Sequence, residues 1–119
     1  MIERYVIELE PEVRGWLESL PIAEYRGVAE LADLLAENAT TLDEPYAKSL
    51  GDGVRELRIR LHPLSMRITS WIAPQRRVVL LTVFAKTRDR ETRQVERAKL
   101  ARKVCAEEHD VAVGVFTRE

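Results

Sequence analysis

Residues 55–62 read Arg-Glu-Leu-Arg-Ile-Arg-Leu-His, and the alternation of apolar and polar side chains in this stretch decides the fold. A period of two is typical of a β-strand that buries one face and exposes the other. The same alternation returns in residues 66–72, whereas residues 78–85 are apolar on both faces. The sequence therefore predicts three consecutive strands, the third of which lies in the centre of the sheet.

The segments on either side of these strands predict one more strand and three helices. A strand is expected over residues 2–9, a helix from Pro11 to the stop at Pro21, and a second helix over residues 22–38. A third helix is expected over residues 91–108. Its inner face is formed by Val95, Ala98, Ala101 and Cys105. Residues 111–119 fit either a short extra strand or a tail. This order predicts an α+β fold in which an N-terminal strand and helical hairpin pack on an antiparallel sheet, with a C-terminal helix.

The composition indicates a single domain over residues 1–119, because 45% of the residues are hydrophobic and can bury a core. The apolar runs are too short to cross a membrane and the N-terminus lacks the features of a secretory signal, so we expect a cytoplasmic protein. With one cysteine and two histidines, we expect no internal disulfide, no metal site and no cofactor.

The net charge of −1 conceals an uneven distribution along the chain. Residues 1–53 carry 4 Lys and Arg against 12 Asp and Glu, whereas residues 54–103 carry 14 against 4. Such asymmetry within one domain is typical of a protein with one region suited to polyanions. Scattered arginines on a solvated surface are the alternative interpretation.

Two expected loops place the basic side chains on one face of the sheet. If residues 62–65 form the first loop, Arg60 lies opposite Arg67; if residues 73–76 form the second, Thr82 lies opposite Arg67. The residues collected on this face are Glu56, Arg58, Arg60, Arg67, Trp71, Thr82 and Lys86.

Two arginines facing each other across a pair of strands destabilise the sheet unless an anion neutralises them. The pair therefore favours a phosphate site, although both guanidiniums could instead extend into water or pair with Glu56. A second basic patch, Lys86, Arg88 and Arg90, lies where the third strand ends. His62 and Glu56 are the candidate acid or base residues, and a lone loop histidine also occurs as a purely structural residue.

Three short motifs follow one another along the chain. Residues 53–58 read Gly-Val-Arg-Glu-Leu-Arg, residues 66–68 read Met-Arg-Ile, and residues 79–87 read Val-Leu-Leu-Thr-Val-Phe-Ala-Lys-Thr. A looser match, Ala98 to Arg102, lies in the last helix. In this order and spacing they resemble the RelE/HigB superfamily of toxins of type II toxin–antitoxin systems, and most of all its phage-derived HigB-like branch. The resemblance covers about residues 20–106.

The resemblance implies a RelE-like fold and a ribosome-dependent mRNA interferase, a metal-independent endoribonuclease that inhibits translation. It also implies a cognate antitoxin, usually of helix-turn-helix type, in a toxin–antitoxin hetero-oligomer, with the ribosome and mRNA as further partners and no membrane. On the matched positions and the face described above, we expect Arg67, Lys86 and Arg58 to be catalytic. The residues expected to bind RNA are Arg60, Arg88, Arg90 and Trp71.

Several positions depart from the pattern of the superfamily. Met66 and Ser70 stand where many relatives have tyrosines, and Thr87 replaces the second lysine of the last motif. The last helix contains no tyrosine, so a general base is not identified by the resemblance. The alternative hypotheses are therefore a noncatalytic RelE-like module that binds RNA or an antitoxin partner, and a small phage structural protein.

Overall fold

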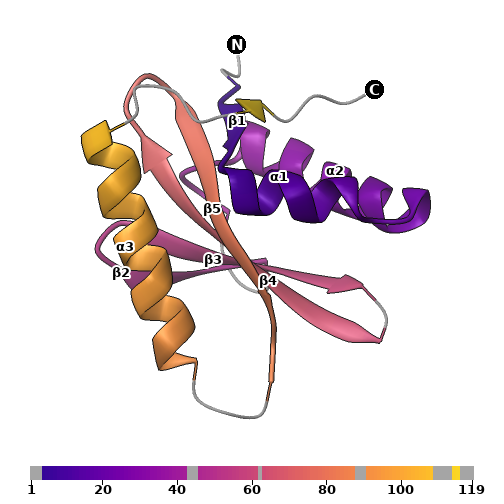
Figure 1. Ribbon diagram of the computed structural model, residues 1–119. Coiled ribbons are helices and arrows are strands. Elements are labelled where there is room, and N and C mark those ends of the chain that lie inside the picture. Colours follow the sequence, from indigo (N-terminus) through magenta and orange to yellow (C-terminus); the bar gives the residue numbers. More distant parts are fainter. Residues whose placement is uncertain (1–3, 43–45, 62, 88–90, 109–113, 116–119) are drawn as a thin grey trace.

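The computed structural model describes residues 4–42, 46–61, 63–87, 91–108 and 114–115. Helices and strands follow one another in a single layered unit (Figure 1). In chain order they are β1 (Val6–Leu9), α1 (Pro11–Glu18), α2 (Ile22–Glu37), β2 (Ala47–Gly51), β3 (Val54–Leu61), β4 (Leu64–Ala73), β5 (Arg77–Ala85), α3 (Thr92–Glu108) and β6 (Gly114–Val115).

The strands of the described residues form one six-stranded sheet in the order β2-β3-β4-β5-β1-β6, with helices on both faces. Helices α1 and α2 lie on one side of it and α3 lies on the other (Figure 1). The larger core cluster, which includes Val28, Leu57 and Ile68, fills the space under α1 and α2. The smaller cluster, which includes Val79 and Ala98, lies under α3. Both faces of the central strand β5 are therefore buried, as its apolar sequence predicts.

The predicted α+β fold is confirmed, with an N-terminal strand, a helical hairpin and a C-terminal helix. The prediction that the sheet is antiparallel is wrong in one respect, because β1 pairs with β5 in parallel. Two helices and three strands separate β1 from β5 along the chain, yet the two strands are neighbours in the sheet. Because this pair is parallel and the others are antiparallel, the sheet is mixed. The periodicity of a short segment predicts a strand, but it does not predict which strand far away in the sequence will be its neighbour in the sheet.

Strand β2 was not predicted from the sequence. It pairs antiparallel with β3 at the edge of the sheet, and residues 51–53 turn the chain between the two strands. All three turn residues have positive φ: 92° at Gly51, 55° at Asp52 and 77° at Gly53. The sequence does not predict this strand because Lys48, Ser49 and Gly51 have low β propensity. At the opposite edge, β6 pairs antiparallel with β1.

The hairpin between β3 and β4 is tighter than predicted. Leu64 and Ser65 are not loop residues but pair with Leu61 and Arg60, which leaves a two-residue connection at residues 62–63. Arg67 therefore lies opposite Arg58, and the predicted pairing of Arg67 with Arg60 is wrong. Because the register moves by two residues, each side chain keeps its predicted face of the sheet.

The hairpin between β4 and β5 also differs from the prediction. Ala73 pairs with Arg77, so the turn consists of residues 74–76, with positive φ at Gln75 and Arg76. A register shift next to Thr69 then moves the pairing by one more residue. As a result Thr82 lies opposite Thr69, whereas Phe84 occupies the position opposite Arg67 that the sequence assigned to Thr82.

The inner face of α3 agrees with its predicted helical stripe. Ala98 and Cys105 are buried against the sheet, and Ala101 packs beside them. Burial, together with the nearby carboxylate of Glu10, raises the pKa of the Cys105 thiol to about 11. Cys105 is thus a core residue, as predicted. In the described part of the chain, no helix is long and apolar enough to cross a membrane.

Candidate functional site

The face of the sheet on the α3 side carries a cluster of two arginines and a glutamate, Glu56, Arg58 and Arg67, which we call the arginine cluster. The alternation of β3 directs Leu57 and Ile59 into the core under α1 and α2, and so directs Glu56 and Arg58 to the opposite face. Arg58 lies directly opposite Arg67 on β4. The alternation of the sequence thus places arginines of both strands on one face. The register set by the tight hairpin determines that Arg58 is the one opposite Arg67.

Glu56 lies between the two arginines and partly neutralises their charge. Its Oε2 atom lies 3.5 Å from Nε of Arg58 and 3.5 Å from Nε of Arg67. The Glu56 side chain is 12% exposed, and those of Arg67 and Arg58 are 15% and 31% exposed. A carboxylate between two guanidiniums offsets their mutual repulsion, most effectively where water is partly excluded.

The outer ends of both guanidiniums keep hydrogen-bonding capacity. Arg67 donates from Nη1 to the carbonyl oxygen of Met66 at 3.3 Å. Among the described residues, Glu56 is the ion-pair partner of Arg58, and it contacts Nε. Guanidinium groups bind phosphate oxygens through paired N–H donors, so this cluster is suited to a phosphate.

Three side chains lie next to the arginine cluster on the same face of the sheet: Thr69, Thr82 and Phe84, which we call the floor of the site. The hydroxyls of Thr69 and Thr82 lie 2.6 Å apart, and the Thr82 amide donates to Thr69 Oγ1 at 3.1 Å. Both threonines are buried, and Phe84, opposite Arg67, is 7% exposed. Burial and hydrogen bonding therefore fix the two threonines beside the arginines.

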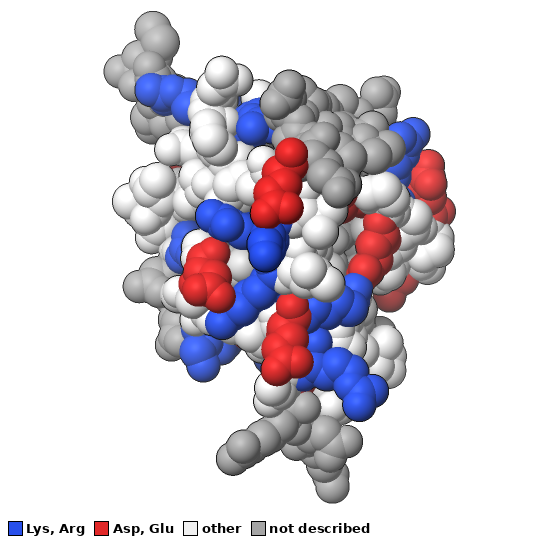
Figure 2. Space-filling view, turned by 60° about the vertical axis from the view of Figure 1, so that its left-hand side comes forward, with Lys and Arg blue, Asp and Glu red and all other residues white. Residues whose placement is uncertain are grey.

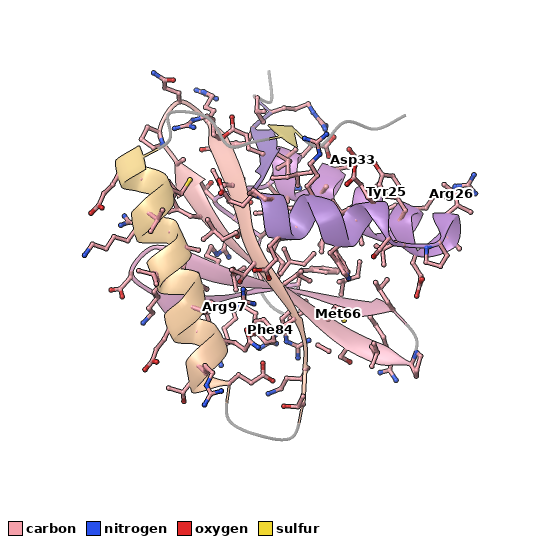
Figure 3. The ribbon with its side chains drawn as sticks, in the orientation of Figure 1. Tyr25, Arg26, Asp33, Met66, Phe84 and Arg97 are labelled. Atoms are coloured by element: carbon pink, nitrogen blue, oxygen red, sulfur yellow. The ribbon has the colours of Figure 1, made fainter. Side chains whose placement is uncertain are left out.

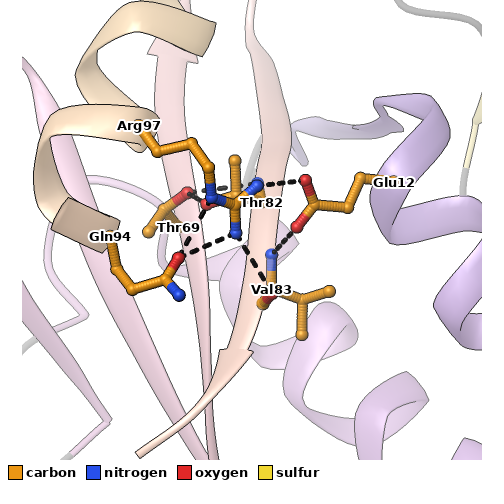
Figure 4. Close-up of polar contacts among 6 residues, drawn as sticks. All are labelled: Glu12, Thr69, Thr82, Val83, Gln94 and Arg97. Atoms are coloured by element: carbon orange, nitrogen blue, oxygen red, sulfur yellow. Dashed lines mark hydrogen bonds and ion pairs between the residues drawn. The ribbon is translucent and has the colours of Figure 1, made fainter. Parts of the chain in front are cut away.

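A second polar group, which the sequence did not predict, borders this floor at the edge of β5 (Figure 4). Arg97 of α3 bonds to Gln94 Oε1 through Nε and Nη2, at 3.0 and 2.9 Å. It also pairs with Glu12 of α1 and donates to the Val83 carbonyl oxygen at 3.4 Å. Glu12 in turn accepts from the Val83 amide at 2.9 Å.

These contacts cap a strand edge that β1 leaves unpaired. Strand β1 ends beside Leu80, whereas β5 continues to Ala85. Arg97 reaches from α3 toward β5 near Phe84, whereas Tyr25, Arg26 and Asp33 lie on α2 across the sheet (Figure 3). One signal could have revealed Arg97: Gln94 and Arg97 are polar residues spaced i, i+3 beside the buried Ala98 on the sheet-facing side of α3.

Lys86 lies just beyond the end of β5, and its ammonium group forms an ion pair outside the arginine cluster. Its Nζ lies 2.9 Å from Oε1 of Glu91, and the Thr87 amide donates to the same oxygen at 3.2 Å. Ala85, next to Lys86, is paired with Met66, next to Arg67. Lys86 thus borders the cluster, with its charge held by Glu91.

The other expected RNA-binding residues are dispersed. Arg60 is exposed and lies opposite Ser65. Trp71 is half-buried at the other end of the face, with the Arg102 guanidinium 4.9 Å from its ring centroid. The structure therefore does not bring Trp71 together with Arg67. His62, Arg88 and Arg90 lie outside the described residues.

The surface around α3 carries charges of both signs. Figure 2 shows Lys and Arg side chains across this face, interspersed with Asp and Glu. Within the described ranges, no group of three or more His, Cys, Asp or Glu residues is placed to hold a metal ion. The basic surface is thus divided by acidic partners, and the arginine cluster is one of its enclosed parts, as is the ion pair of Arg77 with Glu8.

Two solved structures share this fold. One chain of the toxin–antitoxin complex RelBE2 from Mycobacterium tuberculosis is 21% identical, with a TM-score of 0.54 over 72% of this chain and 95% of that chain. A free mutant of the E. coli toxin RelE is 10% identical, with a TM-score of 0.55 over 83% of this chain and 97% of that chain. The protein therefore has the RelE-like toxin fold.

The family of the chain follows from a match of its sequence to a family model. Residues 15–104 match the family described as phage derived protein Gp49-like (DUF891), and the chain belongs to this family. No curated protein matches the sequence. The phage-derived family and the RelE-like fold that the resemblance implies are thereby confirmed.

Proposed function

We propose that this protein is the toxin of a toxin–antitoxin system and that it acts as a ribosome-dependent mRNA interferase. The observation that carries the proposal is the arginine cluster, in which Arg58 and Arg67 face each other on a RelE-like sheet. Membership of the phage-derived Gp49-like family supports it. Of the expected catalytic residues, Arg58 and Arg67 form the core of the proposed site and Lys86 its border.

The reaction that suits this site is attack of an mRNA 2′-hydroxyl on the adjacent phosphate. The O2′–P bond forms and the P–O5′ bond breaks, which gives a cyclic phosphate and a free 5′-hydroxyl; one proton leaves the 2′-oxygen and one is added to the 5′-oxygen. Negative charge develops on the phosphate oxygens in the transition state. Fixed guanidinium donors stabilise that charge. DNA lacks the 2′-hydroxyl and should not be cleaved.

We also propose that a cognate antitoxin of helix-turn-helix type binds this chain in a hetero-oligomer. The M. tuberculosis chain with the same fold was crystallised in a toxin–antitoxin complex. An antitoxin would have to hinder access of RNA to the arginine cluster or hold the protein away from the ribosome. Co-expression with the adjacent small reading frame should then restore growth and give a stable complex on a sizing column.

The test of the activity is primer extension on a reporter mRNA during a short pulse of expression in the cytoplasm of a bacterial host. We expect cuts inside the reading frame, and we expect them to vanish when the start codon of the reporter is removed. Cuts that persist without translation would contradict ribosome dependence. An intact message in the presence of folded protein would favour the alternative, a noncatalytic module that binds RNA or an antitoxin.

A further inference from the structure

Glu56 is the carboxylate nearest to the paired arginines, and its geometry differs from that of a free general base. A general base must lie within hydrogen-bond reach of the proton that it removes. Oε2 of Glu56 is instead shared between Nε of Arg58 and Nε of Arg67, at 3.5 Å from each. The side chain is also 12% exposed, so it has little access to a substrate hydroxyl.

Glu56 contacts the inner edges of both guanidiniums. Nε is the guanidinium nitrogen closest to the main chain, and the two Nη groups lie beyond it. Nη1 of Arg67 donates to the Met66 carbonyl oxygen. Among the described residues, no hydrogen bond is made by Nη2 of Arg67 or by either Nη of Arg58. Nε of Arg58 donates a hydrogen bond to Glu56, whereas the buried Nε of Arg67 lies at ion-pair distance from the same oxygen without a hydrogen bond. The outer edges are therefore available to a ligand while Glu56 faces both inner edges.

We infer that Glu56 is a positioning residue that holds Arg58 and Arg67 side by side so that both can donate to one phosphate. This inference rests on the proposed function and assigns a role within the same site. Without the carboxylate, two cations on directly opposed positions repel each other and lose their alignment. The same carboxylate lowers the net positive charge of the site and so weakens its attraction for phosphate.

This role predicts opposite effects on binding and on rate when the charge of Glu56 is removed. In Glu56→Gln the site gains positive charge, so RNA should bind more tightly. The guanidiniums lose their common anchor, so cleavage should become slower, because small misplacements of catalytic groups cost much of the rate. Loss of a general base would also slow cleavage, but it would remove the acidic limb of the pH–rate profile and would leave the exchange of the Arg58 Nε–H unchanged.

The experiment combines three measurements on the full chain. The first follows the arginine Nε–H signals by NMR: hydrogen exchange at Arg58, which donates to Glu56, should accelerate in Glu56→Gln, whereas Arg97, bonded to Gln94, should not change. The second measures anisotropy with a 2′-O-methyl oligonucleotide, which lacks the reacting hydroxyl; we expect about 3- to 10-fold tighter binding. The third measures cleavage on translating ribosomes, which should fall about 10-fold or more.

Two further variants isolate the cause. Glu56→Asp keeps the charge but shortens the reach, so it should bind RNA with the original affinity and still cleave slowly. Glu37 lies at the end of α2 and forms an exposed ion pair with Arg4. Glu37→Gln removes this distant carboxylate and should change none of the three measurements. If Glu56→Gln does not fold, the exchange of the arginine Nε–H signals in Glu56→Asp decides the question.

Unchanged Nε–H exchange at Arg58, or weaker RNA binding by Glu56→Gln, would overturn the inference. Neither of these measurements requires cleavage. If the unaltered protein does not cut mRNA on ribosomes, the proposed function fails, while the exchange and binding data still decide whether Glu56 positions the arginines.

Discussion

Glu12 of α1 and Arg97 of α3 form an ion pair around the edge of β5, and so join two helices that lie on opposite faces of the sheet. Between them they bind both the amide and the carbonyl group of Val83. Side chains here replace the strand that would otherwise pair with the second half of β5. The contact links the two helical layers at a place where the sheet has no neighbouring strand among the described residues.

We expect Arg97→Ala to lower the free energy of unfolding by about 1 kcal/mol, because it removes the hydrogen bond to Val83 together with a half-exposed ion pair. Urea denaturation followed by circular dichroism measures the change. Arg93→Ala, at an exposed position of the same helix, is the control and should shift the midpoint little. Equal midpoints for the two variants would show that the edge contact does not stabilise the fold.

Arg67→Ala should reduce mRNA cleavage about 100-fold, as removal of one fixed transition-state donor does in other enzymes. Arg67→Lys should recover little of this activity, because an ammonium group lacks the paired donors of a guanidinium. Growth of cells that express each variant gives a first readout, and ribosome-based cleavage gives the rate.

The matched control for these variants is Arg14→Ala, which removes an exposed arginine from α1 on the other side of the sheet. It should arrest growth as the unaltered protein does. Undiminished growth arrest by the double variant Arg67→Ala, Lys86→Ala would refute the assignment of the site.

The same substitution, glycine to alanine, should have opposite effects at two positions. Gly15 lies inside α1 with nothing within 4 Å of an added Cβ, so Gly15→Ala should stabilise the protein by about 0.5–1 kcal/mol. Gly53 has φ +77°, and an added Cβ would lie 3.5 Å from Trp71. Gly53→Ala should therefore destabilise by about 1 kcal/mol. Thermal unfolding of both variants under one set of conditions provides the measurement, and shifts of the same sign would contradict it.

Cys105 should react very slowly with thiol reagents in the folded protein. Its pKa of about 11 leaves the thiol almost entirely protonated at pH 8, and burial restricts access. Labelling with iodoacetamide should accelerate strongly in denaturant. Fast labelling of the native protein would show that the C-terminal part of α3 opens readily.

The same pKa predicts how stability depends on pH. The thiol ionises near its ordinary value of 9.0 in the unfolded chain but near 11 in the folded one, so its contribution to stability is full below pH 9 and is lost between pH 9 and 11. Cys105→Ala should remove this part of the alkaline decline. Chemical denaturation at several pH values compares the two proteins.

The alternation around Leu57 and Ile59 was sufficient to predict which side chains share a face, because that depends on a period of two and not on register. The partner of Arg67 could not be predicted, since it depends on whether Leu64 belongs to the loop or to the strand. The parallel pairing of β1 with β5 and the contact between Glu12 and Arg97 depend on chain crossings that no local pattern encodes. Glu56 was recognised as a candidate, but the two Nε contacts that suggest its role appear only in the folded geometry.

The pairing of β1 with β5 also affects the order in which the protein forms during synthesis. Val6 pairs with Arg77, so β1 leaves the ribosome about 70 residues before its neighbour β5 is synthesised. The hairpins of β3, β4 and β5 can close earlier because they are local. The arginine cluster on β3 and β4 can therefore assemble while the sheet that supports it is still incomplete, and the parallel pairing of β1 with β5 forms later.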